Sequence, residues 1–215
     1  MKKNSAMVAA FFLATLIPAT AQDVFSHPMD EASKPQVILI CNRMGQHKVI
    51  KASFTQTKTI TRLSRTFTST GRMIFDVARG LLWEVRDPFP SATVMTRDRI
   101  AQRSSSGKIS VLPASNNDTF RRFSATMQAV LNGDFKSIEN GFVIHFMMPS
   151  DGRWIIGLVP RDRTLLGVIK AMEIWGASDL EGFSLKEASG DSVTYKFSGV
   201  SYPEKLDIND EKAFF

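Results

Sequence analysis

Hydrophobic and polar residues alternate with a period of two along most of this chain, as is typical of strands with one covered face. The clearest case is the run from Thr70 to Pro90. A short connection around Gly80 divides it, and two prolines end it, which predicts a hairpin. One face of this hairpin carries large apolar side chains, namely Met73, Phe75, Val77, Leu81, Trp83 and Val85. On composition alone, such a face fills a β-sandwich core.

Similar alternation predicts a series of further strands. They cover residues 50–56, 57–70, 92–103, 108–112, 141–148, 154–160, 165–177, 182–188 and 192–197. Short turns separate most of them, so each strand should pair with the next in an antiparallel meander. A sheet of about ten or eleven strands tends to curl, close or split. We therefore predict a mainly β fold with helices (α+β), in which a strongly curved antiparallel sheet forms a half-open barrel.

Two segments follow a helical period instead. Residues 35–46 place Val37, Ile38, Cys41 and Met44 on one stripe. Residues 116–131 place Phe120, Phe123, Met127, Val130 and Leu131 on one face, and Gly133 ends the pattern. Both helices are expected to cover the open side of the sheet, either as a static plug or as a lid.

The N-terminus has the features of an export signal. Lys2 and Lys3 precede an apolar run from Ala6 to Ile17, and Ala19 and Ala21 supply the small residues of a cleavage site. We expect cleavage after Ala21, so that residues 22–215 form a single domain in the periplasm. A retained membrane anchor is the alternative, but the apolar run is shorter than a bilayer span. Residues 23–34, which are polar, should form a flexible lead.

Charge and cysteine content limit which kinds of partner and which covalent links this protein can have. The 27 basic and 21 acidic residues give a net charge of +6, which removal of Lys2 and Lys3 lowers to +4. The basic residues are scattered, which argues against nucleic acid as a partner. One cysteine cannot form an internal disulfide, and no cysteine lies at the cleavage site for a lipid anchor. Cys41 follows an apolar run and is predicted to be a small buried hydrophobe.

Catalytic and metal-binding patterns are missing from the sequence. We find no nucleophile elbow, zinc-protease motif or phosphate loop, and the three histidines are dispersed. His145 alternates with apolar residues and is interpreted as a strand histidine rather than a base. We expect no catalytic residues, no metal and no cofactor. The sequence is instead rich in large apolar side chains, with 16 Phe, 10 Met and 3 Trp.

Several of these residues carry a resemblance to a known family. The F-x-Q strand at Phe54 and Gln56, the Gly-led strand at Gly71 and Phe75, and its partner at Trp83 and Pro88 resemble the LolA family of periplasmic lipoprotein carriers, in particular its divergent branch. The resemblance implies a helical lid and no covalent chemistry. It also implies that an acylated lipoprotein or other acyl lipid passes from an inner-membrane exporter to an outer-membrane acceptor. We expect a monomer.

The sequence departs from the family at one position. LolA-like carriers have a lid-latching arginine six positions before the tryptophan, where this chain has Val77, and the nearest arginine is Arg79. The resemblance therefore does not carry over the latch, and it leaves open whether the cargo is a lipoprotein or another acyl lipid.

Alternation and the resemblance together define candidate cargo-facing residues. They are Phe54, Met73, Phe75, Trp83, Phe123, Met127, Phe146, Met148 and Trp154. Met-lined surfaces repack around different apolar ligands, which suits a carrier of acyl chains. Two other functions stay open: a non-carrier envelope module that binds or senses protein partners, and a hydrolase of acyl esters.

Overall fold

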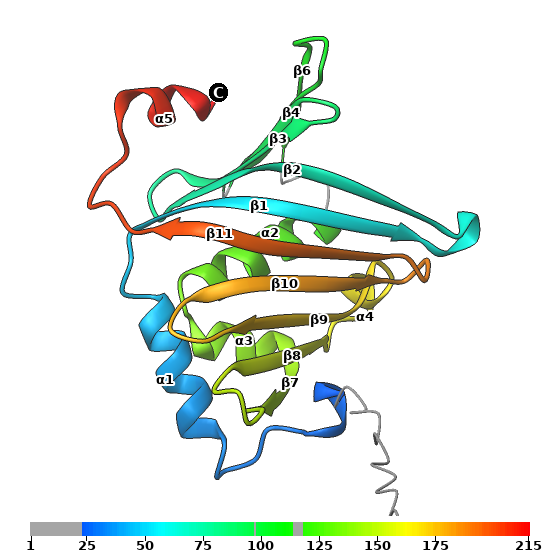
Figure 1. Cartoon of the computed structure of the whole chain (residues 1–215), viewed down its shortest axis with the longest axis vertical. Coiled ribbons are helices and arrows are strands. Elements are labelled where there is room, and N and C mark those ends of the chain that lie inside the picture. The colour runs from blue at the N-terminus through cyan, green and yellow to red at the C-terminus, as the bar shows by residue number, and fades with distance from the viewer. Residues whose placement is uncertain (1–22, 97, 114–117) are drawn as a thin grey trace, which may run out of the picture.

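The computed structural model describes residues 23–96, 98–113 and 118–215. Eleven strands in these ranges form one antiparallel sheet (Figure 1). They are β1 (Val49–Ile60), β2 (Arg65–Asp76), β3 (Gly80–Asp87), β4 (Ser91–Met95), β5 (Arg99–Arg103), β6 (Ile109–Pro113), β7 (Phe142–Met147), β8 (Trp154–Pro160), β9 (Ile169–Gly176), β10 (Leu180–Glu187) and β11 (Ser192–Ser201). The helices are α1 (Lys34–Met44), α2 (Asp118–Leu131), α3 (Phe135–Gly141), α4 (Arg163–Leu166) and α5 (Ile208–Ala213), with short 3-10 turns η1 (Val24–Ser26) and η2 (Thr61–Leu63).

The strand order confirms the predicted meander and adds one long-range pairing. The order is β6-β5-β4-β3-β2-β1-β11-β10-β9-β8-β7. Within each half, successive strands are neighbours, and β1 pairs with β11 to join the halves. The connection from β6 to β7 runs through α2 and α3. Because β6 and β7 lie at opposite edges of the order, the curved sheet is not closed.

The two faces of the sheet bury separate clusters. The inner face, defined here as the one that α1, α2 and α3 cover, contributes most of the larger cluster, which includes Phe54, Phe75 and Leu158. Figure 1 shows α2 and α3 behind the strands β10 to β7. The outer face carries a smaller cluster of Val49, Ile74, Leu82, Ala92, Val94, Ala101 and Leu206. The helical cover therefore agrees with the expected half-open barrel.

The two helices expected to cover the sheet meet at glycines. Helix α1 is followed by Gly45, and α2 ends shortly before Gly133, whose φ is +62°. A Cβ at Gly133 would overlap the Cys41 carbonyl oxygen and lie 2.8 Å from the Gly45 nitrogen. The helix ends thus touch backbone to backbone, which only glycine permits at this position.

Three expected strand boundaries are wrong. The strand expected at 165–177 begins only at Ile169, because the preceding residues form α4, which the Asp162 side chain caps. Residues 57–70 are not a separate strand, since they belong to the ends of β1 and β2 around η2. Residues 92–103 form two strands, β4 and β5, which pair with each other. Neither turn contains glycine or proline. Ser64 adopts a left-handed φ of +49°, and the Thr96 hydroxyl accepts hydrogen bonds from the amides of Asp98 and Arg99 at 3.2 and 3.1 Å. The usual turn signals were therefore absent.

The segment expected to be a flexible lead is instead docked on the sheet. Asp23 caps η1, and Val24 is only 2% exposed. The Met29 amide donates to the Ile144 carbonyl, and the Phe146 amide donates to the His27 carbonyl, both at 2.9 Å. Gly157 leaves the space for this contact, since a Cβ there would lie 3.0 Å from Val24 Cγ1. Residues 24–29 thereby cover the edge strand β7.

The C-terminal segment covers the outer face. Asp210 of α5 is 3% exposed, and its carboxylate accepts hydrogen bonds from Lys51 and, at 2.6 Å, from Arg72. Arg72 also donates to Glu84 at 2.5 Å. Leu206 and the side chains of residues 213–215 then close the outer cluster. This second core was not predicted.

Candidate ligand-binding interior

The inner face is organised around a stacked pair of aromatic rings. Phe54 on β1 is opposite Gly71 on β2, and Met73 on β2 is opposite Trp83 on β3. A Cβ at Gly71 would lie 2.6 Å from Phe54 Cζ, so the absence of a side chain there lets the Phe54 ring lie across β2. The ring reaches Trp83, with centroids 4.8 Å apart and planes at 26°. The motif residues Phe54, Gly71 and Trp83 are thus one packing unit.

Three rings from the end of the chain join this pair. Tyr195 and Phe197 on β11 and Phe183 on β10 lie 4.6, 6.2 and 5.9 Å from Trp83 between ring centroids. We call these five residues, Phe54, Trp83, Phe183, Tyr195 and Phe197, the aromatic cluster. Burial in this apolar surrounding raises the pKa of Tyr195 to about 12. Phe54 is fully buried, but the other four are only partly buried, so part of the cluster is open to solvent.

Helix α2 lies over one side of the aromatic cluster and leaves a small cavity there. Its volume is about 20 Å³, and it is lined by Leu81, Trp83, Met127, Val130, Leu131, Met172, Ile174, Leu180, Phe183 and Phe197. All ten side chains are apolar apart from the indole N–H. The Trp83 Nε1 atom is buried and has no acceptor among the described residues. This space could hold about one water but no acyl chain, since small-molecule pockets are typically ~300 Å³ or more.

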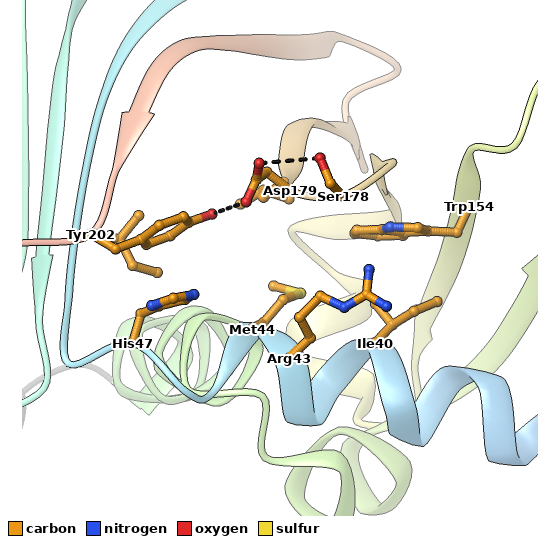
Figure 2. A pocket seen from close by; sticks show the side chains of 10 residues that line it. Ile40, Arg43, Met44, His47, Trp154, Ser178, Asp179 and Tyr202 are labelled. Carbon is orange, nitrogen blue, oxygen red and sulfur yellow. Dashed lines mark hydrogen bonds between the residues drawn. The ribbon is translucent and has the colours of Figure 1, made fainter.

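A second cavity of about 30 Å³ lies at the margin of the interior, between α1 and the turn that joins β9 to β10. Figure 2 shows Trp154 on one side and the stacked His47 and Tyr202 on the other. The His47 and Tyr202 rings are 3.6 Å apart. Trp154 donates from Nε1 to the Ala177 carbonyl at 2.8 Å, and the Tyr202 hydroxyl donates to Asp179 at 2.7 Å. We call this space the marginal cavity.

The two cavities adjoin the same side chain. Leu180, the first residue of β10, is 9% exposed and lines both of them. The marginal cavity is also lined by Ile40 and Ile50, which belong to the larger buried cluster of the inner face. Apolar surface is therefore continuous from the marginal cavity to the aromatic cluster, with Leu180 between them.

The structure places the candidate cargo-facing residues in three groups. Trp83 and Met127 line the cavity under α2, and Trp154 lines the marginal cavity. Phe54, Met73, Phe75 and Phe146 are buried in the same inner cluster but line neither cavity. Met148 is 54% exposed, beyond the end of β7, so its expected place on the inner face is wrong. Phe123 lies in α2, but its side chain is outside the described part of the structure.

Sequence reasoning did not select several residues of this interior. Phe183, Tyr195 and Phe197 lie on strands that were predicted, and Leu180 lies between the predicted strands 165–177 and 182–188, but no motif marked any of them. The alternation of Tyr195 and Phe197 was the available signal. It indicates that both side chains share a face, but not that this face meets Trp83.

Other predicted positions have plain structural roles. Cys41 is a buried free cysteine, as expected, and burial raises its pKa to about 11. His145 lies on a strand with its ring edge-on to Phe25 at 5.5 Å. Across residues 23–96, 98–113 and 118–215, no three His, Cys, Asp or Glu side chains gather as metal ligands would. None of the helices in these ranges is both long and apolar enough to cross a membrane.

The position of the missing latch lies in a pocket that Val77 and Arg79 share with Gln128 of α2. Val77 is 44% exposed in the connection between β2 and β3. Arg79, the nearest arginine, forms an ion pair with Glu211 of α5 at 2.7 Å. Because α5 covers the outer face, Arg79 does not replace a latch on α1 or α2.

Comparisons with known proteins point to one family. The family model described as "Outer membrane lipoprotein carrier protein LolA" matches residues 45–210. No curated protein matches the chain in sequence. Similar solved structures include a LolA superfamily protein from Nitrosomonas europaea, with 11% identity, a TM-score of 0.45, and coverage of 84% of this chain and 96% of that one.

Two further structures have comparable similarity. Lipoprotein LppX of Mycobacterium tuberculosis has 13% identity and a TM-score of 0.43, with 81% of this chain and 100% of that one covered. The MucA/MucB complex of Pseudomonas aeruginosa has 12% identity and a TM-score of 0.44, with 84% of this chain and 60% of that one covered.

Proposed function

The chain belongs to the LolA family of outer membrane lipoprotein carrier proteins, and from this premise we propose that it is a periplasmic carrier. It binds the acyl chains of a lipoprotein or a related lipid between the inner face of the sheet and helices α1–α3. It moves this cargo from an inner-membrane exporter to an outer-membrane acceptor, without covalent chemistry. Residues 1–21, which lie outside the described ranges, are the signal that exports it, with cleavage after Ala21.

The aromatic cluster is the observation that carries this proposal. An acyl chain of about fifteen methylenes costs roughly 12 kcal/mol to expose to water, at about 0.8 kcal/mol per methylene. Only a large apolar surface offsets that cost. Four rings of the aromatic cluster are partly open to solvent, and α2 supplies Met127, Val130 and Leu131 beside them. Adjacent aromatic side chains that are partly exposed support a binding surface at this place.

The small volume of the cavity under α2 requires this helix to move if the protein is a carrier. A cavity of 20 Å³ excludes an acyl chain, so α2 moves away from the sheet when the cargo enters. In the empty protein, Met127, Val130 and Leu131 occupy the place that the cargo takes. Met127 suits this exchange, because an unbranched thioether side chain adapts to differently shaped apolar partners. With Val77 at the latch position, the cover is held by apolar packing and by the ion pair of Arg122 of α2 with Asp162 at 3.3 Å.

The filled interior also supports a second candidate. A binding or sensor module of the same fold needs no lipid-sized space, and 20 Å³ is consistent with a permanent core. Such a module would contact protein partners through its surface and would stay empty.

One experiment separates these two functions. The mature protein is purified from a periplasmic extract and analysed by lipid mass spectrometry, and uptake of a fluorescent acyl probe is titrated. A carrier contains or takes up acyl lipid. Phe183→Asp, at a partly buried position of the aromatic cluster, should weaken uptake at least about tenfold.

The matched control is Phe67→Asp. Phe67 also lies on a strand but is 47% exposed and belongs to neither buried cluster. This variant should bind as the wild type does. If the wild-type protein takes up no acyl compound while its thermal unfolding is cooperative, the carrier function is wrong and the module is supported.

A further inference from the structure

The marginal cavity joins an apolar floor to a polar rim. Its apolar side includes Trp154 and Leu180, while Arg43, His47, Asp179 and Tyr202 provide polar groups (Figure 2). The chain brings these groups together from the end of α1, the β9–β10 turn and the segment after β11. An amphiphilic ligand matches such a site, because its tail and head need opposite surroundings.

Arg43 is the charged group of this rim that is available to a ligand. It lies in the last turn of α1 and is exposed, and Figure 2 shows its side chain rising from the helix into the space below Trp154. Asp179 is the one carboxylate among the lining residues of this cavity. It already accepts hydrogen bonds from Tyr202 at 2.7 Å and from Ser178 at 3.3 Å. A guanidinium binds carboxylate or phosphate through paired N–H donors.

The turn opposite Arg43 is held rigidly. A Cβ at Gly176 would lie 2.6 Å from Trp154 Cζ2, and the Trp154 indole donates to the Ala177 carbonyl in the same turn. The Tyr202 bond to Asp179 ties the turn to the end of β11 as well. These contacts fix Leu180, which separates the marginal cavity from the cavity under α2.

We propose that the marginal cavity is the entrance to the interior and that Arg43 binds the anionic head of an acyl lipid there. The acyl chain passes Leu180 and lies against the aromatic cluster under α2. This inference rests on the proposed carrier function and specifies its ligand class as acyl compounds with a carboxylate or phosphate head.

The test compares three single-chain probes on the full mature protein. Palmitate carries a carboxylate, palmitoyl lysophosphatidic acid carries a phosphate, and methyl palmitate is neutral. Their dissociation constants are measured by tryptophan fluorescence for the wild type and Arg43→Gln. The variant should bind one or both anions about tenfold or more weakly, and methyl palmitate within twofold of the wild type. Loss with palmitate alone identifies a carboxylate head, and loss with the phosphate alone identifies a phosphate head.

Two further variants complete the test. Arg62→Gln removes a charge from an exposed arginine of η2, remote from the marginal cavity, and should change none of the three constants. Leu180→Ala should speed uptake of all three probes at least threefold, since it joins the two cavities. If the Arg43→Gln variant binds the anions as the wild type does, or loses the neutral ester equally, Arg43 is not the head-group residue. If the Leu180→Ala variant takes up the probes at the wild-type rate, the marginal cavity is not the entrance.

The outcomes for this inference differ from those for the carrier function. A wild-type protein that binds none of the three probes refutes the proposed function and the inference together. A wild-type protein that binds all three, with Arg43→Gln behaving identically, retains the carrier and overturns only the inference.

Discussion

Trp83 and Phe54 are stacked across an intervening strand, with ring centroids 4.8 Å apart, because Gly71 between them has no side chain. The relationship explains why a glycine, a phenylalanine and a tryptophan so far apart in the sequence occur together. It also places the largest aromatic side chain at the centre of the inner face, where the other four rings of the aromatic cluster contact it or one another.

Replacing Gly71 should therefore disturb the site through packing. A Cβ there would overlap the Glu84 carbonyl oxygen and lie 2.6 Å from Phe54 Cζ. We expect Gly71→Ala to lower the free energy of unfolding by about 2–3 kcal/mol, as overpacking of a core does, measured by urea denaturation. Gly141→Ala is the control, since a Cβ at Gly141 meets nothing within 4 Å. If Gly71→Ala leaves the free energy of unfolding unchanged, the packing of Phe54 against Gly71 is not as described.

Cys41 offers a probe for opening of the helical cover. Burial, with a smaller contribution from the Asp134 charge, raises the pKa of its thiol from 9.0 to about 11. Because the thiolate is the reactive form, only about 0.1% of the thiol is reactive at pH 8. Labelling by a disulfide reagent at pH 8 should be at least about 100-fold slower than that of a small free thiol. Rapid labelling of the folded protein would show that α1 does not cover this residue.

The contact between α1 and α2 should control that labelling rate. Gly133→Ala forces a left-handed φ of +62° on a side chain and overlaps the Cys41 carbonyl. We expect a loss of about 2–4 kcal/mol in stability and faster labelling of Cys41. Gly152→Ala is matched in φ, at +80°, but meets no atom within 4 Å. It should cost about 1–2 kcal/mol and leave the labelling rate unchanged.

The docking of α5 should depend on Asp210 far more than on its neighbour. The Asp210 side chain is only 4% exposed and accepts charge-assisted hydrogen bonds from Lys51 and Arg72. Asp210→Ala should therefore cost about 2–3 kcal/mol through loss of these bonds. Glu211 and its partner Arg79 are 44% and 42% exposed. Glu211→Ala should therefore cost less than about 1 kcal/mol. If Asp210→Ala and Glu211→Ala lower the stability measured by thermal unfolding equally, this prediction is wrong.

Acid should loosen the outer face. Burial alone would raise the pKa of Glu84, but its bonds and charge interactions with Arg72 and Arg86 outweigh burial and hold that pKa below 4.5. Since the folded pKa is lowered, the stabilisation is present above pH 4.5 and is lost as the pH falls through the folded value. The protection factors of the amides of residues 206–213, which correct for the pH dependence of intrinsic hydrogen exchange, should thus be larger at pH 7 than at pH 3. Protection that grows on acidification would contradict this assignment.

Local patterns were sufficient for much of this architecture. Alternation located the Met73–Val85 hairpin and correctly assigned Met73, Phe75, Leu81 and Trp83 to one face. The helical stripe of Val37, Cys41 and Met44 corresponds to α1. These predictions succeeded because the period of side-chain directions depends only on the conformation of each segment.

The turns that contain neither glycine nor proline were beyond such patterns. At Ser64 and Thr96, a left-handed serine and a threonine hydroxyl bend the chain. Residues of these types also occur within strands, so their presence does not distinguish a turn from its surroundings.

The contents of the interior depended on long-range pairing. Alternation states which side of its own strand a residue occupies, but not which strand lies beside it. The pairing of β1 with β11 brings Tyr195 and Phe197 to Phe54 and Trp83. The return of α5 to the outer face buries Ile74 and Leu82, which a single covered face would have left exposed. Both outcomes are set by the path of the whole chain, because burial is a property of assembled surfaces rather than of one strand.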